Sequence, residues 1–92
     1  MGAINMDAIN VMVKDVANFF NNLDGRDYRV MAAFYNEDGF YIGQIERNFK
    51  DGCLDMDSEL RALWRKKVKF YNKITLQGVD ILVFIVLKGE EK

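Results

Sequence analysis

The sequence contains no histidine and no proline, and it has a single cysteine, Cys53. Without histidine, the commonest general base near neutral pH is missing, and no cysteine–histidine pair of the protease type can form. A single cysteine excludes an intrachain disulfide, which is typical of proteins from a reducing compartment. The sequence also lacks a phosphate-binding glycine loop and a dinucleotide-binding fingerprint. These absences predict a protein that is not an enzyme and that uses no cofactor or metal.

Long apolar runs are missing as well. The longest, Ile81 to Leu87, is far too short to span a bilayer. The first residues lack the basic, apolar and small-residue order of a secretory signal. Ninety-two residues, half of them hydrophobic, suffice for one domain over residues 1–92, with residues 89–92 as a flexible tail. We therefore expect no membrane partner and a cytoplasmic location, or a host cytoplasm if the source is a virus.

The positive charges are concentrated late in the chain. The first 59 residues contain five basic and eleven acidic side chains, and the remaining residues contain eight basic and three acidic ones. Six of the thirteen cations fall between Arg61 and Lys73, interleaved with Trp64, Phe70 and Tyr71. Cations beside flat aromatic rings suit nucleic acid or an acidic protein surface. This stretch is the strongest indication of a partner in the sequence.

Apolar spacing predicts two helices and four strands. Apolar residues three and four apart predict a helix from about Asn5 to Leu23, and a second helix runs from Met56 to Lys66 with Asp55 or Asp57 as its N-cap. Alternating apolar residues bounded by turn signals predict the strands. They are Tyr28 to Asn36 and Phe40 to Glu46, joined by a loop with Gly39, and Lys67 to Leu76 and Val79 to Leu87, joined by Gln77 and Gly78.

The two predicted hairpins have defined registers. In the first, Tyr35 lies opposite Tyr41 and Phe34 opposite Ile42. In the second, the two-residue turn pairs Leu76 with Val79. Continued without interruption, this register places Tyr71 opposite Phe84, with Asn72 opposite Val83 as an irregular point that is either a bulge or a hydrogen-bonded polar group. It predicts that one set of residues faces the core: Val68, Phe70, Ile74, Ile81, Ile85 and Leu87. A second set is predicted to lie on the helix-free face: Lys69, Tyr71, Lys73, Leu82, Phe84 and Val86.

The element order is helix, strand, strand, helix, strand, strand. It predicts an α+β domain with a four-stranded antiparallel sheet and both helices on one face. The layout is similar to a circularly permuted ferredoxin-like domain in which the first strand comes last. That resemblance implies a central strand at Val79 to Leu87 and an edge strand at Lys67 to Leu76. Two αββ units side by side are the alternative arrangement.

The predicted helix-free face carries the leading functional hypothesis. Large apolar side chains at Leu82, Phe84 and Val86 on such a face imply a cover, either a second copy of the chain or another protein. We therefore expect a small non-enzymatic binding protein, a homodimer or a protein-docking module, with Tyr71, Leu82, Phe84 and Val86 as its interaction residues. A compact chain without motifs also suits an accessory or inhibitor protein of a virus or mobile element.

Two alternatives use other properties of the same residues. The first is a single-stranded nucleic-acid-binding module, in which Lys69 and Lys73 hold phosphates while Tyr71 and Phe84 stack on bases. The second is a small enzyme of unknown type, with thiol-only or paired-carboxylate chemistry as the remaining routes.

Overall fold

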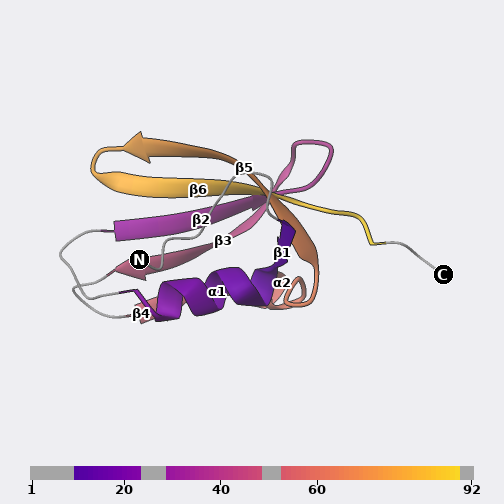
Figure 1. Ribbon diagram of the computed structural model, residues 1–92, viewed down its shortest axis with the longest axis horizontal. Helices are drawn as coiled ribbons and strands as arrows, with labels where there is room; N and C mark the ends of the chain where they lie inside the picture. The colour runs from indigo at the N-terminus through magenta and orange to yellow at the C-terminus, as the bar shows by residue number, and fades with distance from the viewer. Residues whose placement is uncertain (1–9, 24–28, 49–52, 90–92) are drawn as a thin grey trace.

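The computed structural model describes residues 10–23, 29–48 and 53–89 (Figure 1). Within these residues the chain forms six strands and two helices. In chain order they are β1 (Asn10–Met12), α1 (Val13–Asn21), β2 (Arg29–Tyr35), β3 (Tyr41–Asn48), β4 (Cys53–Asp55), α2 (Ser58–Arg61), β5 (Lys67–Leu76) and β6 (Val79–Val86).

The strands form one mixed sheet in the order β1-β5-β6-β2-β3-β4. Strand β2 runs parallel to β6, and the remaining neighbours are antiparallel. The α+β class is therefore confirmed. The predicted four-stranded antiparallel sheet is wrong, and so is the permuted ferredoxin-like order, because that order places the antiparallel strand β3 beside β6, whereas the structure has the parallel strand β2 there.

The apolar content of β2 explains why it lies beside β6. Apolar side chains on both faces favour a place inside a sheet over a place at its edge. In β2, Val30, Ala32 and Phe34 are buried on one face, while Met31 and Ala33 occupy the other. Strand β3 instead carries Gln44, Glu46 and Arg47, so it lies nearer the sheet edge. This pattern favours the interior position of β2, where it pairs with β6 in the parallel direction.

Helix α1 begins later than the spacing of apolar residues predicts. Residues 10–12 form β1, which pairs with the start of β5, with Asn10 opposite Lys69. The N–H groups of Val13 and Lys14 then donate to the carbonyls of Lys66 and Trp64 at 2.9 and 3.1 Å, so the first turn of the helix is tied to the segment before β5. Residues 5–9 of the predicted helix lie outside the described residues.

Helix α2 is shorter than predicted but has the expected N-cap. The Asp57 side chain accepts a hydrogen bond from the backbone N–H of Leu60 at 2.9 Å. After Arg61 the chain continues in tight turns, in which Leu63 and Trp64 donate to the carbonyls three residues earlier. These turns lead the chain directly into β5 at Lys67.

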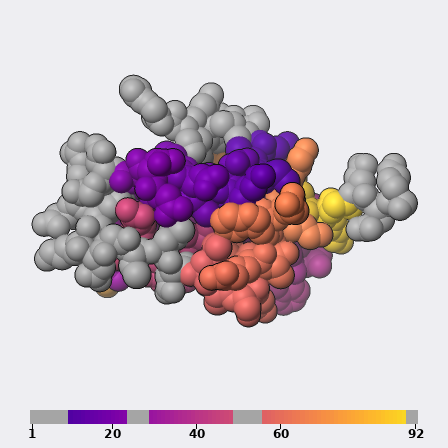
Figure 2. Space-filling view, turned by 90° about the horizontal axis from the view of Figure 1, so that it is seen from below, coloured from indigo at the N-terminus to yellow at the C-terminus, as the bar shows by residue number. Residues whose placement is uncertain are grey.

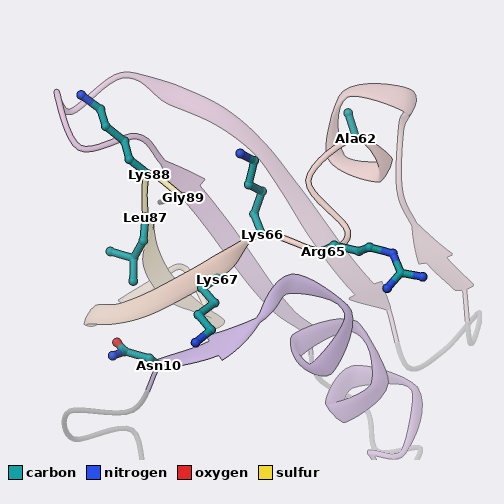
Figure 3. Close-up of a pocket in the computed structure, with 8 residues that line it drawn as sticks. All are labelled: Asn10, Ala62, Arg65, Lys66, Lys67, Leu87, Lys88 and Gly89. Carbon is teal, nitrogen blue, oxygen red and sulfur yellow. The ribbon is translucent and has the colours of Figure 1, made fainter. Parts of the chain in front are cut away.

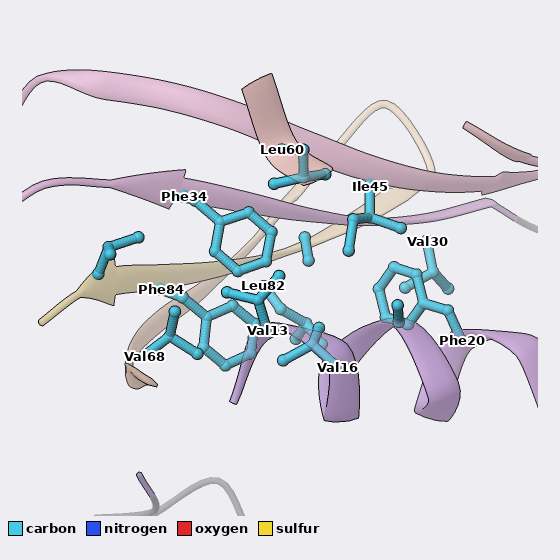
Figure 4. Packing of buried hydrophobic residues seen from close by; sticks show 13 residues of the cluster. Val13, Val16, Phe20, Val30, Phe34, Ile45, Leu60, Val68, Leu82 and Phe84 are labelled. Carbon is cyan, nitrogen blue, oxygen red and sulfur yellow. The ribbon is translucent and has the colours of Figure 1, made fainter. Parts of the chain in front are cut away.

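The core lies between the two helices and one face of the sheet (Figure 4). One side of α1 contributes Val13, Val16, Ala17 and Phe20, and Leu60 enters from α2. The prediction that both helices lie on one face is confirmed. Figure 2 shows α1 and the α2–β5 segment side by side on the surface, as the hydrogen bonds of Val13 and Lys14 require. The sheet contributes Val30, Ala32, Phe34, Ile45, Val68, Leu82, Phe84 and Val86.

A bulge in β5 reverses the predicted faces of β6 and of the part of β5 from Asn72 to Leu76. The predicted register holds from Leu76 opposite Val79 to Asn72 opposite Val83, and then shifts so that Phe70 pairs with Phe84. Tyr71 is the extra residue. The bulge leaves Asn72 exposed, where its Oδ1 accepts from the N–H of Lys73 at 2.8 Å, while Val68 and Phe70 still face the core. A polar side chain is thereby kept out of the interior.

The bulge places three of the four predicted interaction residues in the core. Leu82, Phe84 and Val86 are 8%, 2% and 7% exposed, and Phe84 stacks on Phe34 with ring centroids 5.6 Å apart. The prediction that they lie on the helix-free face is wrong. Ile74, predicted to face the core, is 42% exposed. Ile81 and Ile85, also predicted to face the core, lie on the opposite face of β6 from Leu82 and Phe84.

The first hairpin also contains a bulge. Tyr35 lies opposite Tyr41 as predicted, but Phe34 pairs with Gly43 rather than with Ile42. The space above Gly43 is filled by Leu60, whose Cδ1 would lie 3.7 Å from an added Cβ. Gly43 therefore lies directly beneath Leu60, and an added methyl group would make an ordinary contact with it.

Candidate functional site

The face of the sheet away from α1 and α2 carries most of the exposed apolar side chains, and we call it the open face. No helix within the described residues covers it. The residues that the strand registers place on its β2, β5 and β6 portion include Met31, Ala33, Tyr35, Asn72, Ile74, Leu76, Ile81, Val83 and Ile85. Tyr71, Ile74 and Leu76 are 68%, 42% and 56% exposed.

A hollow of about 440 Å³ lies on the open face between β5 and the β2–β3 loop. We call it the tyrosine hollow, since Tyr35 and Tyr71 both line it. Half-buried Val83 and Ile85 of β6 and exposed Ile74 of β5 supply apolar groups. Its other lining residues are Asn36, Glu37, Gly39 and Asn72.

The loop at one side of the tyrosine hollow is held by its own hydrogen bonds. Asn36 Oδ1 accepts from the N–H groups of Asp38 and Phe40 at 2.9 and 3.0 Å. The backbone N–H of Asn36 donates to the Phe40 carbonyl at 2.9 Å, and Gly39 adopts a φ of 91° that favours glycine. The hollow is therefore bordered by a loop of defined shape.

The β3 portion of the open face is polar. The Tyr41 hydroxyl donates to Gln44 Oε1 at 2.6 Å, and the Gln44 amide donates to Glu46. Tyr35 and Tyr41 meet edge to face with ring centroids 5.6 Å apart. Burial raises the pKa of the Tyr41 phenol above 10.0, with a further contribution from negative charges, Asp57 first among them. The open face thus has an apolar part over β2, β5 and β6 and a hydrogen-bonded polar part over β3.

The structure separates the residues predicted for protein interaction. Tyr71 lines the tyrosine hollow, whereas Leu82, Phe84 and Val86 are buried against the helices. Ile81, Val83 and Ile85 take their place on the open face. The sequence does signal that β6 is apolar on both faces, but the bulge in β5 decides which face the helices cover.

The residues predicted for nucleic-acid binding are also divided. Lys69 pairs with Ile85 and lies on the open face with Tyr71. Lys73 pairs with Leu82, on the other side of the bulge, and its side chain belongs to the helix-side face. Phe84 is buried. Only half of the predicted basic-aromatic set remains together.

A second hollow, about 840 Å³ in volume, lies where the α2–β5 connection meets the end of β6 (Figure 3). We call it the basic hollow, because four cations line it: Arg65, Lys66, Lys67 and Lys88. Its other lining residues are Asn10, Ala62, Leu87 and Gly89. Lys88 was not predicted as part of a site. It is far from Lys67 in sequence, but the Leu87 N–H donates to the Lys67 carbonyl at 2.9 Å and so brings them together.

Other kinds of site have little support in the described part of the chain. Residues 10–23, 29–48 and 53–89 contain no cluster of acidic, cysteine or histidine side chains suited to a metal ion. Among the helices formed by these residues, none has the length and apolar character needed to cross a membrane. Comparisons with protein-family models, curated proteins and solved structures found no match. The geometry of the two hollows is therefore the basis for assigning a function.

Proposed function

We propose that this chain is a non-enzymatic binding protein that docks a second protein chain on its open face, with the tyrosine hollow as the anchor point. The observation that carries the proposal is the exposed row of Tyr71, Ile74 and Leu76 beside that hollow. The partner is a second copy of the chain or a different protein. The predicted binding role is retained, but its residues are now Tyr35, Tyr71, Ile74, Val83 and Ile85.

The chemistry of the row supports protein docking. Contiguous apolar groups are uncommon on the surface of monomers and often mark interaction sites. Tyrosine is enriched at protein interfaces because its ring is apolar and its hydroxyl is polar. The bonded loop of Asn36 to Phe40 borders the hollow. A preformed border lowers the entropy cost of binding.

The outer edge of β5 offers a second mode of contact to the same partner. Strand β1 pairs with β5 only at Lys67, Val68 and Lys69. From Phe70 to Leu76, β5 has no further strand beside it within the described residues. Backbone groups on such an edge can accept an added strand. A partner seated on the open face can therefore also extend the sheet.

Light scattering across a concentration series tests self-association. We expect a dimer that dissociates in the Tyr71→Lys and Ile74→Lys variants, because each places a charge in the apolar contact. Phe40→Lys is a matched control, since Phe40 is 69% exposed and does not line the tyrosine hollow. Circular dichroism of every variant checks that the fold is retained. Equal loss of the dimer in the Phe40 control would contradict the proposed surface.

A monomer at high concentration would contradict self-association and leave a different protein as the partner. A photo-crosslinking residue at position 71 then identifies that protein in the source cells, with position 40 as the control. We expect crosslinking from position 71 only. Equal yields from the two positions, or none from position 71, would contradict docking on the open face.

A further inference from the structure

The basic hollow lies apart from the tyrosine hollow and has a different chemistry. Arg65, Lys66, Lys67 and Lys88 line it, and no acidic side chain is among its lining residues. Within the described residues these four cations form no ion pair. We propose that the basic hollow binds the phosphate backbone of a single-stranded nucleic acid. The basic hollow shares no lining residue with the tyrosine hollow, so changes at Lys67 and Lys88 leave the proposed docking residues unaltered.

Backbone hydrogen bonds hold the cation-bearing segments in place. The Val13 N–H donates to the Lys66 carbonyl and the Lys14 N–H to the Trp64 carbonyl, which fastens the segment before β5 to the start of α1. The Leu87 N–H donates to the Lys67 carbonyl and fastens the end of β6 to the start of β5. The concentration of positive charge is therefore built into the fold, and an anion need not assemble it.

The directions of the four side chains favour an extended polyanion over a single small anion. In Figure 3, Lys66 and Lys88 extend to one side of the connecting segment, whereas Lys67 extends toward Asn10. The Arg65 guanidinium points away from these lysines. Cations that converged on one point would hold one phosphate ion. Cations spread around a rim instead suit the successive phosphates of a chain, which lysine and arginine contact without reading its sequence.

The neighbouring residues of β5 favour a single strand. Lys67 and Lys69 lie on the same face of β5, and Tyr71 follows at 68% exposure. Alternation along a strand repeats a face every two residues, so the cations lead from the basic hollow onto the open face. Proteins that bind single strands combine a basic groove with aromatic rings on which bases stack. A flat bilayer surface, by contrast, does not enter a recess.

One carboxylate is close to this site. Glu37 Oε2 accepts from the backbone N–H of Lys88 at 3.3 Å. Its negative charge lowers the attraction for phosphate, so Glu37→Gln is expected to strengthen binding. The whole chain has a net charge of −1, and binding therefore depends on the local cations rather than on overall attraction.

Fluorescence anisotropy with short labelled oligothymidine and oligouridine tests the proposal. We expect a Kd that rises steeply with salt, as displacement of counterions from phosphates requires. The Lys67→Glu, Lys88→Glu double variant is expected to weaken binding about tenfold or more and to reduce the log–log salt slope by about 2, roughly one for each lost contact. Glu37→Gln is expected to tighten binding about twofold at low salt.

The matched control is the Arg29→Glu, Lys73→Glu double variant. It makes the same change in net charge at exposed residues that do not line the basic hollow. Equal weakening by the two double variants would overturn the site, because it would show attraction to charge alone. Absence of oligonucleotide binding at low salt would also overturn it. So would binding to vesicles of anionic lipid, with no oligonucleotide binding, through the same lysines.

Light scattering of the Lys67→Glu, Lys88→Glu variant separates this proposal from docking on the open face. We expect its mass to equal that of the unmodified chain, because neither lysine lines the tyrosine hollow. Loss of oligonucleotide binding with an unchanged mass supports the basic hollow alone. A change in mass together with lost binding would contradict the independence of the two sites.

Discussion

Phe70 lies opposite Phe84 across β5 and β6, with ring centroids 5.8 Å apart and ring planes at 71°. An uninterrupted register from the turn at Gln77 and Gly78 would place Tyr71 there. The one-residue bulge at Tyr71 puts Val68 and Phe70 on the same side as Leu82, Phe84 and Val86, and that side is covered by the helices. A one-residue shift in a strand exchanges its two faces, so this bulge decides which residues can meet a partner.

The core position of Phe84 predicts a large effect on stability. Phe84→Ala is expected to lower the free energy of unfolding by about 3–5 kcal/mol, because it leaves a cavity between Phe34 and Phe70. Tyr71→Ala is the control and is expected to change the same quantity by less than about 0.5 kcal/mol, since its ring is exposed. Urea denaturation measures both. Similar losses in the two variants would contradict the bulge.

The N-cap of α2 predicts a smaller effect. Asp57→Ala is expected to lower the free energy of unfolding by about 1 kcal/mol, because the Leu60 N–H loses its acceptor. The loss extends to the core, since Leu60 is fully buried. Asp57→Asn keeps a cap acceptor and is expected to retain most of the stability. Thermal or urea unfolding of the two variants provides the comparison, and equal losses would argue against a capping role.

The turn between β5 and β6 offers a stabilising substitution. Gln77 and Gly78 have φ values of 52° and 79°, a combination that Asn followed by Gly adopts readily. Gln77→Asn is expected to raise the free energy of unfolding by about 0.5 kcal/mol, and Gly78→Ala to lower it by roughly 1 kcal/mol. Gly89→Ala is the control, because Gly89 is exposed and has no positive φ. A stabilising Gly78→Ala would contradict this turn geometry.

Tyr41 predicts a dependence of stability on alkaline pH. In the unfolded chain its phenol ionises near 10.0, whereas in the folded chain burial and neighbouring negative charges raise its pKa. The unfolded state therefore releases this proton first, and the free energy of unfolding falls as the pH rises above 10.0. Tyr41→Phe is expected to reduce that fall, while losing less than about 1 kcal/mol near neutral pH with the hydrogen bond to Gln44. Urea denaturation on both sides of pH 10.0 measures it, and an unchanged slope in Tyr41→Phe would contradict the shift.

The features that sequence reasoning predicted correctly are those with local causes. The turn at Gln77 and Gly78, the positive φ of Gly39 and the cap at Asp57 each depend on a few neighbouring residues. The apolar stripe of α1 is also readable, because side chains three and four apart share a helix face. For Asn72, a polar residue in a row of apolar ones, the sequence allows either a bulge or a hydrogen-bonded polar group, and the structure has the bulge.

The features that it missed depend on contacts between distant segments. Strand β1 forms from residues predicted as helix because β5 supplies its partner, with Val11 opposite Val68. Lys88 joins the basic hollow through the pairing of Leu87 with Lys67. Neither contact leaves a signal within a short window of sequence. The parallel neighbour of β6 was missed for the same reason.

The sequence by itself determined the α+β class, the order of the main helices and strands, the two hairpins and the concentration of cations between Arg61 and Lys73. These follow from backbone preferences and apolar periodicity, which act over a few residues. Only the tertiary structure decided that β2 lies beside β6, that Phe84 faces the helices, and that Lys88 meets Lys67. Those choices depend on burial and hydrogen bonding summed over remote elements, so the tertiary structure also determines which residues form the two hollows.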